Sequence, residues 1–561
     1  MLLLRVDLAE LKIKKENIPS EYRLFSGRAL TSRIISDEVS GTCHPLGPFN
    51  KLVIANGLLA GTPVSSASRI SIGAKSPLTS GIKESNGGGN TAYKMARLGI
   101  RAIILEGETK TKSNWYILYI NKEGAKLIDG SYLENKGTYD KTDALHEQYG
   151  KNIGIILIGP AGEQLSITAG ITNTDIEGNP SRYCGRGGLG AVMGSKRILA
   201  IVLDDAGTSP VKPVETDNFK YLLKKYTALI RSTPQTAEGF PKYGTAGMME
   251  ITNTIGALPT RNFSTGTFEG AAKINGQALY DTITERGGEG ASTHACMPGC
   301  IIRCSNRYPD KDGKILVSPL EYETIAMLGS NCDIDDLDVI AKLNYICNDY
   351  GIDTIEFGCT IGVLMEKGIM AFGDTKEIVK VAEEMQKGSY LGKIIGAGSI
   401  IAGQVFGVTR VPAVKGQGMP AYDPRSVKGL GVTYSTSPMG ADHTAGNTVR
   451  LNIKHHLKDN QVEISKNAQL GATLFDSLGI CIMVGAAVKD KNLLAGLISS
   501  HTGLACSEDI LIEIALSTLT TEKKFNNSAG ITSVHDRLPE FFYTEVNPSN
   551  GVAFDIFDQD L

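Results

Sequence analysis

Short runs of aliphatic and β-branched residues, separated by glycine, dominate the first 205 residues of the chain. The clearest runs are 51–54, 102–105, 115–120, 153–158 and 198–203. Runs of this length, bounded by glycine, are typical of buried strands. We therefore predict that this part of the chain is mainly β-sheet. No repeat of fixed period is visible along the chain.

The hydrophobic period becomes that of a helix after a polar, proline-bearing stretch near residue 207. Apolar side chains recur on one helical face over 219–230, with Asp217 as the candidate cap. A second helix is predicted over 333–348, because acidic residues open it and Gly351 follows its end. Helical patterns continue beyond this point.

A second boundary is expected near residue 400, where a Gly-rich stretch leads into a segment with many prolines and glycines. The expected domains are therefore a β-rich domain over 1–207 and two mainly helical domains over 208–400 and 401–561. The predicted fold class is α+β.

Composition limits the functions that the chain can have. Its 561 residues include 57 basic and 60 acidic ones, for a net charge of -3, which gives no electrostatic footprint for nucleic acid or an anionic membrane. No apolar run is long enough to cross a bilayer, and the first residues lack the features of a signal peptide. The 10 cysteines are too few for a secreted disulfide framework. We expect a cytoplasmic protein without a nucleic-acid or membrane partner.

Three cysteines are bunched in the segment THACMPGCIIRC, at Cys296, Cys300 and Cys304. Closely spaced thiolates with a distant fourth are how proteins hold a [4Fe-4S] cluster. Zinc is the rival interpretation, although the chain offers no second closely spaced pair of ligands. The third interpretation is that the three cysteines bind no metal. Single distant candidates for the fourth thiolate are Cys332, Cys347, Cys359, Cys481 and Cys506.

Two Gly-rich segments could bind an anion. They are residues 85–90 (SNGGGN) and 184–190 (CGRGGLG), where Arg186 adds a guanidinium to exposed backbone N–H groups. Residues 185–190 also satisfy G-x-G-x-x-G, but a dinucleotide fold needs a strand directly before this motif, and the sequence SRYC precedes it. Plain turn glycines are the remaining interpretation.

Several polar residues of the predicted helical part could move protons. They are Glu321 and Glu323 in SPLEYETIAMLGSN, Asp442 and His443 in GADHTAG, and Asp476 in DSLGIC. A histidine beside a carboxylate can transfer protons near neutral pH, although a lone histidine is more often structural.

Taken together, these segments resemble the aldehyde ferredoxin oxidoreductase family, whose members hold tungsten or molybdenum between two pterins. The resemblance runs nearly end to end. It is carried by SRISIGAKSPLTSG, SNGGGN, CGRGGLGAVMGSK, LPTRNFSTGTFEGA, CMPGC, LEYETIAMLGSN, GIDTIEFG, PAYDPRSVKGLGVTYSTSPMGADH and DSLGIC. It implies that the β-rich domain forms a base for both pterins and that the two helical domains cover it.

The resemblance also implies roles for single residues. Those that contact the pterin phosphates, or a Mg²⁺ ion that bridges the two cofactors, are Arg69, Asn86, Gly88, Arg186 and Gly187. The family's two D-x-x-G-x-(C/D) motifs, which touch the pterins, match Asp476–Cys481 fully and Asn348–Asp353 with Asn in place of the first Asp. Its active-site acid and histidine match Glu323, with Glu321 as the alternative, and His443.

The cluster motif departs from the family pattern, because Thr293 stands where the first cysteine is expected. Cys304 could supply the missing thiolate, so the predicted ligands are Cys296, Cys300, Cys304 and Cys481. A cluster with a non-cysteine ligand, or no cluster, stays open.

The activity that the resemblance implies is oxidation of an aldehyde to a carboxylate, with electrons passing through the cluster to ferredoxin or another iron–sulfur carrier. One alternative is a family relative that acts as the catalytic subunit of a larger carboxylate or ring reductase complex. Another is an electron-transfer protein without an active pterin. The sequence does not decide between tungsten and molybdenum, and it does not identify the aldehyde. The assembly can be a homodimer or a hetero-complex.

Overall fold

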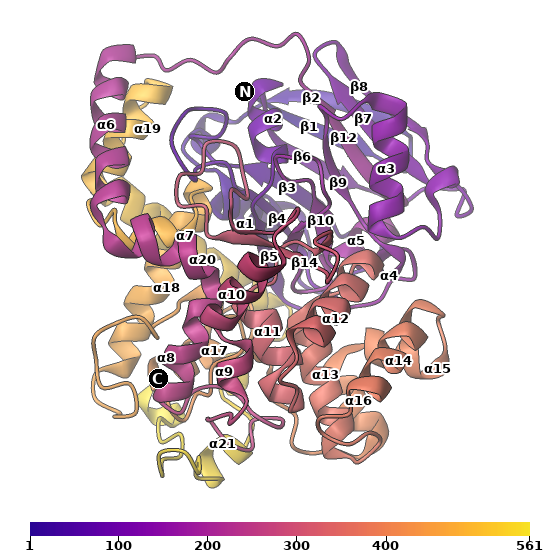
Figure 1. The fold of residues 1–561 in the computed structure, drawn as a ribbon. Helices are drawn as coiled ribbons and strands as arrows, with labels where there is room; N and C mark the ends of the chain where they lie inside the picture. The colour runs from indigo at the N-terminus through magenta and orange to yellow at the C-terminus, as the bar shows by residue number, and fades with distance from the viewer. The chain divides into compact units, whose positions relative to one another are not determined.

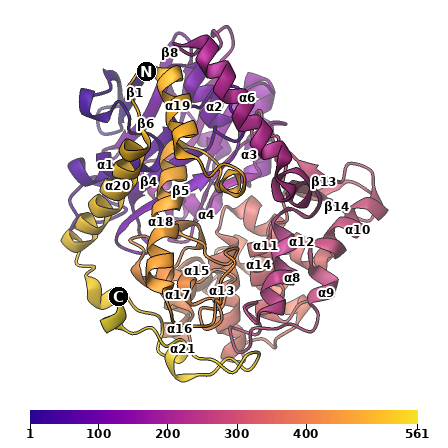
Figure 2. The same cartoon turned by 90° about the vertical axis from the view of Figure 1, so that its left-hand side faces the viewer.

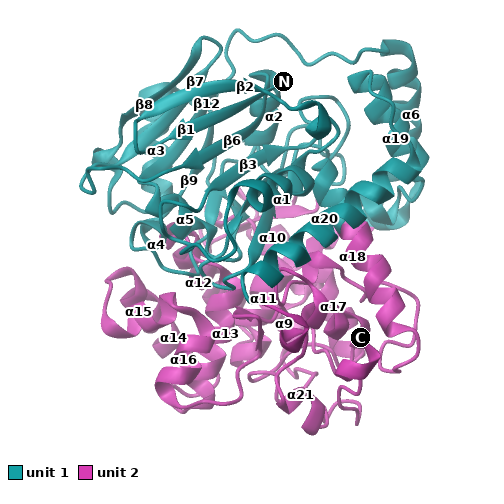
Figure 3. Cartoon of the chain, turned by 180° about the vertical axis from the view of Figure 1, so that it is seen from behind, with its two compact units in different colours: residues 1–238, 295–302, 473–530 teal, residues 239–294, 303–472, 531–561 magenta.

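The computed structural model describes all 561 residues, and the chain divides into two compact units (Figure 3). Unit 1 comprises residues 1–238, 295–302 and 473–530, and unit 2 comprises residues 239–294, 303–472 and 531–561. The segment 295–302, which carries Cys296 and Cys300, therefore belongs to unit 1, whereas Cys304 belongs to unit 2. No helix is sufficiently long and apolar to span a membrane.

Unit 1 is built on two six-stranded sheets with the same strand order. The first is β2-β1-β6-β3-β4-β5, and the second, read in the matching direction, is β8-β7-β12-β9-β10-β11. The strands are β1 (Leu2–Asp7), β2 (Lys12–Asn17), β3 (Leu52–Asn56), β4 (Ile70–Lys75), β5 (Ile82–Gly87), β6 (Ile100–Glu106), β7 (Tyr116–Asn121), β8 (Gly124–Asp129), β9 (Gly154–Leu157), β10 (Ile171–Asn173), β11 (Arg182–Cys184) and β12 (Ile198–Asp204).

The second sheet thus repeats the first, strand for strand. In both, the first and sixth strands of the repeat pair in parallel, as β1 with β6 and β7 with β12. The sequence shows no such repeat, because what recurs is the order of elements and not the residues. The five predicted runs are confirmed as β3, β6, β7, β9 and β12.

The helices of unit 1 are α1 (Gly27–Glu38), α2 (Thr91–Arg97), α3 (Thr138–Tyr149), α4 (Pro160–Glu163), α5 (Leu189–Ser195), α6 (Thr216–Ser232), α19 (Lys491–Thr502) and α20 (Glu508–Ser528). They pack on these sheets, as α1, α2 and α5 do, or on other helices, as α6 and α19 do (Figures 1 and 2). Helix α20 lies beside α1, and Phe525 of α20 shares a buried cluster with Leu30 of α1 and Val53 of β3. Burial of such side chains is the main source of stability for this arrangement.

Two sequence predictions about helix starts are corrected. The cap of α6 is Glu215, and Asp217 lies inside the first turn, where its charge favours the positive helix end. The second predicted helix begins at Leu337, after a left-handed turn at Asp333 (φ +63°), and the Asp336 carboxylate caps it. Gly351 does end that helix in the left-handed conformation, with φ +84°.

Unit 2 is mainly helical. Its helices are α7 (Phe240–Tyr243), α8 (Met248–Thr254), α9 (Ala271–Ile274), α10 (Gly276–Arg286), α11 (Tyr322–Leu328), α12 (Leu337–Tyr350), α13 (Thr354–Glu366), α14 (Thr375–Gln386), α15 (Tyr390–Gly396), α16 (Gly398–Phe406), α17 (Lys428–Thr436) and α21 (Phe541–Thr544), and α18 (Gln461–Leu478) begins there and ends in unit 1. Small sheets are formed by β13 (Ala291–His294), β14 (Ser305–Pro309) and β15 (Ile315–Val317), and by β16 (Ala413–Val414) with β17 (Gln417–Gly418). The predicted α+β class, with a β-rich part first and a mainly helical part after it, is confirmed.

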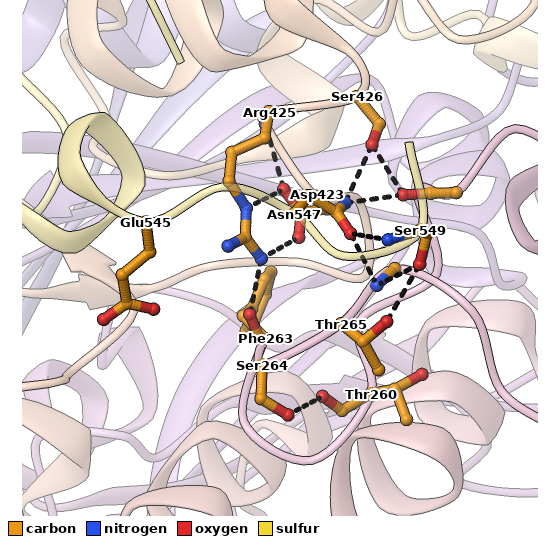
Figure 4. Close-up of polar contacts among 12 residues, drawn as sticks. Thr260, Phe263, Ser264, Thr265, Asp423, Arg425, Ser426, Glu545, Asn547 and Ser549 are labelled. Carbon is orange, nitrogen blue, oxygen red and sulfur yellow. Dashed lines mark hydrogen bonds and ion pairs between the residues drawn. The ribbon is translucent and has the colours of Figure 1, made fainter. Parts of the chain in front are cut away.

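A buried polar network ties three distant loops of unit 2 together (Figure 4). Arg425 forms two bonds to the Asp423 carboxylate, at 3.0 and 2.6 Å, and a third, at 2.5 Å, to the carbonyl oxygen of Phe263. Asn547 donates to Ser426 at 3.0 Å and accepts from the backbone N–H of Gly266 at 3.1 Å. The network fixes the loop that ends at Asp423, and the residues just before it reach the candidate active site.

Candidate active site

The two Gly-rich segments occupy equivalent places in the two repeats of unit 1. Each follows the last strand of its sheet, β5 or β11, and leads into a short helix, α2 or α5. The edge strands meet, since a Cβ on Gly87 would lie 2.9 Å from the sulfur of Cys184. The short strand β11 precedes Gly185, so the sequence argument that no strand does so is wrong, but the mixed sheet around it is not a dinucleotide fold.

Arg69 and Asn86 lie side by side at this junction. The Arg69 guanidinium donates from Nε to the Asn86 side-chain oxygen and from Nη2 to its backbone oxygen, the latter at 3.1 Å. Burial opposes the charged form of Arg69, but nearby Cys481, Cys296 and Asp476 outweigh it, so the pKa of Arg69 is raised. A permanent cation therefore stands beside the first Gly-rich segment.

The second Gly-rich segment carries a buried cation of its own. Arg186 is 7% exposed, and its backbone N–H donates to the Ser85 hydroxyl at 3.3 Å. Gly187 has φ +85°, and a Cβ there would collide with the side chain of Lys83, a residue that the sequence pattern did not single out. Only glycine fits this place, because the lysine side chain passes directly across the backbone. Lys83 and Ser85 could have been found from the two-residue period of β5.

Three cysteines lie near Arg69 or near the segment that precedes it. Ser66 donates to the Cys300 sulfur at 3.3 Å and accepts from the Cys481 backbone N–H at 2.8 Å. Cys296 lies against the first Gly-rich segment, since a Cβ on Gly88 would be 3.2 Å from its sulfur and its carbonyl oxygen accepts from the Gly89 N–H at 2.9 Å.

No disulfide joins any of the cysteines, and no three Cys, His, Asp or Glu side chains converge as ligands of a single metal ion. Cys296, Cys300 and Cys481 all lie in unit 1, close to Arg69 or to Ser66. Cys304 lies in unit 2, where its carbonyl oxygen faces Gly244.

Asp476 lies at the end of α18, in the unit 1 part of that helix. Its Oδ2 is 3.5 Å from Nη1 of Arg28, and Gly479 of the same motif accepts through its carbonyl oxygen from the Arg69 N–H at 3.0 Å. The DSLGIC segment is thereby held against Arg69. The predicted residues Arg69, Asn86, Gly88, Asp476 and Cys481 thus come together in unit 1.

Unit 2 brings Glu323 and His443 together. Glu323 is in the first turn of α11, and its Oε1 lies 3.4 Å from Nε2 of His443, whose side chain is 20% exposed. The Ala421 backbone N–H donates to the other carboxylate oxygen of Glu323 at 2.8 Å. The far ring nitrogen of His443, Nδ1, lies 3.9 Å from the Asp442 carboxylate. The arrangement is a carboxylate–imidazole pair with a second carboxylate behind the imidazole.

Two tyrosines, which the sequence argument did not single out, complete this site. The Tyr422 ring is 6.0 Å from that of His443 and 5.3 Å from that of Tyr322. Tyr322 donates its hydroxyl to the Ala421 carbonyl oxygen at 2.6 Å. Burial raises the pKa of both phenols well above the ordinary value, with Glu323 adding to the shift, so both stay protonated.

The other predicted residues of unit 2 include Glu321, Asp353 and Asn348, which lie on or beside helices α11, α13 and α12. Glu321 caps α11 and accepts from the Thr245 hydroxyl, so it is turned to a different neighbour than Glu323. Asp353 caps α13, and the Thr324–Thr354 hydrogen bond of 2.8 Å joins the start of α13 to the first turn of α11. Asn348 is buried in the last turn of α12.

Buried cations over glycine segments, grouped thiols and a carboxylate–imidazole pair are features of a cofactor-dependent oxidoreductase. The family model for the N-terminal domain of aldehyde ferredoxin oxidoreductase matches residues 3–205, and that for its domains 2 and 3 matches residues 221–560. The chain belongs to the aldehyde ferredoxin oxidoreductase family.

Similar proteins span nearly the whole chain. The tungsten-containing aldehyde ferredoxin oxidoreductase of Pyrococcus horikoshii is 31% identical over 97% of this chain and 92% of its own length, and that of Thermococcus kodakarensis is 30% identical over 97% and 91%. The WOR-like subunit of the aliphatic sulfonate oxidoreductase of Pyrococcus furiosus is 26% identical over 86% of this chain and 79% of its own length.

The fold is shared with a solved structure, the active-site complex BamBC of benzoyl coenzyme A reductase with 1,5-dienoyl-CoA. Its TM-score is 0.80 at 20% identity, over 96% of this chain and 90% of that chain.

Proposed function

We propose that this protein oxidises an aldehyde to a carboxylate at a tungsten or molybdenum bis-pterin cofactor and passes the electrons through a [4Fe-4S] cluster to ferredoxin. The observation that carries the proposal is the pair formed by Glu323 and His443, with 3.4 Å between Oε1 and Nε2. The chain that carries this pair is 30% identical to two tungsten-containing aldehyde ferredoxin oxidoreductases over 97% of its length.

The residues of unit 1 fit the phosphates of such a cofactor. Arg69 and Arg186 supply guanidinium groups, which bind phosphate through two bonds, and Gly88 and Gly187 let the backbone approach closely. Asn86 would help to hold the phosphates or the bridging Mg²⁺ ion. Asp476 in unit 1 and Asn348 and Asp353 in unit 2 would hold the pterin rings. When bound, this cofactor supplies the two-electron redox chemistry that no side chain can.

Glu323 and His443 would carry out the proton transfers. Glu323 has one oxygen fixed by the Ala421 N–H and the other directed to His443, so its carboxylate is oriented before substrate arrives. Glu323 accepts a proton as water adds to the carbonyl carbon, and His443 donates a hydrogen bond to the carbonyl oxygen. Aldehyde and water together give a carboxylate, two electrons and three protons. Tyr322 and Tyr422 keep this pair in apolar surroundings.

The thiolates of Cys296, Cys300 and Cys481, with Cys304 as the fourth, would hold the cluster that passes electrons out singly. Cys300 and Cys481 share the neighbour Ser66, and Cys296 lies against Gly88, which supports a common site for these three residues. Serine and backbone donors near the sulfurs would also tune the cluster potential.

The test is elemental analysis of anaerobically purified protein, together with ferredoxin reduction by a panel of aldehydes. About one tungsten or molybdenum and about four iron atoms per chain, with aldehyde-dependent reduction, are expected. Iron without either heavy metal would favour the electron-transfer alternative. A heavy metal and iron together, but without aldehyde turnover, would favour a subunit of a larger reductase.

A further inference from the structure

A fully buried carboxylate of unit 2, that of Glu356 on α13, holds the strand that precedes the Ala421 loop. One of its oxygens accepts from the backbone N–H and the hydroxyl of Ser399 on α16, at 2.9 and 2.7 Å. The other accepts from the backbone N–H of Gly418 on β17 at 2.6 Å. Burial of a carboxylate is costly unless donors replace its hydration, and here three donors do so. One side chain thereby joins two helices to the β16–β17 hairpin.

The hairpin lies directly against α13 at this point. A Cβ on Gly418 would lie 2.8 Å from Oε2 of Glu356 and 2.9 Å from the sulfur of Cys359, so no larger residue fits without a shift. The Cys359 thiol donates to the Met419 carbonyl oxygen at 3.2 Å. The backbone of Gly418 and Met419 is thus fixed to α13.

Only Pro420 separates this anchored stretch from the backbone group that holds Glu323. The Ala421 N–H donates to Oε2 of Glu323 at 2.8 Å. Proline fixes its own φ, so the place of Met419 largely determines where the Ala421 N–H lies. A displaced Gly418 would therefore move the donor that orients the Glu323 carboxylate.

The hairpin has other anchors that do not involve Glu356. Gln417 donates through Nε2 to the Ala441 carbonyl oxygen at 2.7 Å, and β16 pairs with β17. The hairpin should therefore stay folded when the Glu356 carboxylate is altered, with its end at Gly418 less tightly held.

We propose that Glu356 is a positioning residue for the proton transfer: by fixing Gly418, it places the Ala421 N–H where this group orients the Glu323 carboxylate. Glu356 acts through the backbone between Gly418 and Ala421 and takes no part in the chemistry itself. The role in proton transfer rests on the proposed function, whereas the anchoring of this backbone does not.

The first experiment compares the steady-state kinetics of Glu356→Gln and the wild type, with aldehyde and an artificial electron acceptor. The amide oxygen stays with the two Ser399 donors, so the new NH₂ group opposes the Gly418 N–H and the segment must shift. We expect kcat to fall by roughly 10- to 100-fold, the usual effect of misplacing a reacting group by a fraction of its reach. The KM for aldehyde and the metal and iron contents should stay unchanged. An unchanged kcat would overturn the proposal.

A double-mutant cycle separates positioning from a general loss of stability. If Glu356 acts through Glu323, Glu356→Gln should have little effect on kcat in the Glu323→Gln background, because the carboxylate to be oriented is gone. An equal fall in both backgrounds would overturn the proposal. Gly418→Ala tests the same link with the Glu356 carboxylate intact, also where Glu356→Gln does not fold. It should lower kcat as well, and a wild-type kcat in this variant would contradict the positioning role.

Asp338→Asn is the matched control, because Asp338 also accepts three hydrogen bonds in unit 2, two from Arg286 and one from Tyr308. It should lower the Tm but keep the wild-type kcat. A fall in kcat as large as that of Glu356→Gln would show that any lost carboxylate in this unit has the same effect, and would overturn the proposal.

Hydrogen exchange of a peptide that spans residues 417–422, measured by mass spectrometry on the full chain, tests the anchoring without turnover. This peptide should exchange faster in Glu356→Gln than in the wild type, and Asp338→Asn should not differ from the wild type. Equal exchange in Glu356→Gln and the wild type would overturn the anchoring. A wild-type chain that holds its cofactor but oxidises no aldehyde refutes the proposed function instead, and hydrogen exchange still decides whether Glu356 fixes Ala421.

Discussion

At the scale of single residues, Glu323 and Glu321 separate in role although they are two positions apart. Glu323 faces His443, whereas Glu321 accepts from Thr245 at the start of α11. Two carboxylates two residues apart at a helix start point in different directions, because successive helical residues are turned by about 100°. Only Glu323 is therefore expected to take part in proton transfer.

Replacing Glu323 by Gln tests this assignment. The amide keeps the size of the side chain but cannot accept a proton, so turnover of aldehyde should fall by a factor of about 10² to 10⁴ while metal and iron contents stay unchanged. Steady-state kinetics with an artificial electron acceptor measures this effect.

Glu321→Gln serves as the control for that experiment, and its turnover should stay within a few-fold of the wild type. Unchanged turnover in Glu323→Gln would remove Glu323 from the mechanism and direct attention to Glu321.

The cysteines give a second prediction at this scale. If Cys296, Cys300, Cys304 and Cys481 hold a cluster, Cys300→Ser and Cys304→Ser should each lower the iron per chain and the charge-transfer absorbance of the cluster, because serine is a poor substitute for a soft thiolate. Cys506→Ser is the control, since burial raises the pKa of Cys506 to about 11 and its thiol donates to the carbonyl oxygen of Ser507. Full iron in Cys304→Ser would leave the cluster with a different fourth ligand.

Among the elements, the loop that carries Ala421 and Tyr422 contacts both members of the unit 2 pair, Glu323 and His443. Its far end is anchored by the Asp423–Arg425 ion pair, and both side chains are fully buried. Arg425 also donates to Phe263, in a stretch of three residues with positive φ. Arg425 therefore joins two irregular loops. It stabilises backbone conformations that the loops would not adopt alone.

We expect Arg425→Met to lower the free energy of unfolding by about 3 to 5 kcal/mol, because the Asp423 carboxylate is left buried without its partner. The shift of the urea midpoint, followed by circular dichroism, measures this loss. Lys466→Met breaks the exposed pair with Glu463 and should leave the midpoint unchanged. A loss no larger than in this control would show that solvent reaches Asp423.

Sequence patterns predicted elements better than they predicted what the elements bring together. Five buried strands and the glycine end of α12 follow from local hydrophobic runs and from the backbone freedom of Gly351. The starts of α6 and α12 were misplaced because several acidic residues near each start can cap a helix, and tertiary context chooses among them. Tyr422 carries no local signal, since only the fold brings it to His443.

The duplication in unit 1 escaped sequence analysis for a physical reason. Both sheets need buried aliphatic strands in one order, and many residues satisfy that need equally well, so topology persists where residue identity does not. The two Gly-rich segments differ in sequence, yet both follow the edge strand of their sheet. A cofactor with two similar halves would find two equivalent places on this unit.

At the scale of the whole molecule, the relatives suggest two ways in which such a chain can work. Two are named as aldehyde ferredoxin oxidoreductases, and the sulfonate enzyme is named as a subunit. Identity is higher to the former, at 30 to 31% against 26%, and coverage of the relative's own length is more complete. If the proposed function is right, the isolated chain should be active without a second polypeptide.

The corresponding prediction is that purified chain, loaded with metal and iron, reduces ferredoxin with an aldehyde at a turnover within the ordinary range of about 1 to 10³ s⁻¹ and without any second polypeptide. Size-exclusion chromatography with light scattering on the same sample shows whether active material contains copies of this chain only. The Glu323→Gln variant, prepared in the same way, is the control. Ferredoxin reduction by this variant measures the electrons that arrive without aldehyde oxidation. A loaded chain that gains turnover only when a different polypeptide is added back would mean that electron exit depends on that partner, because the proposed proton-transfer pair and cofactor residues all lie in this chain.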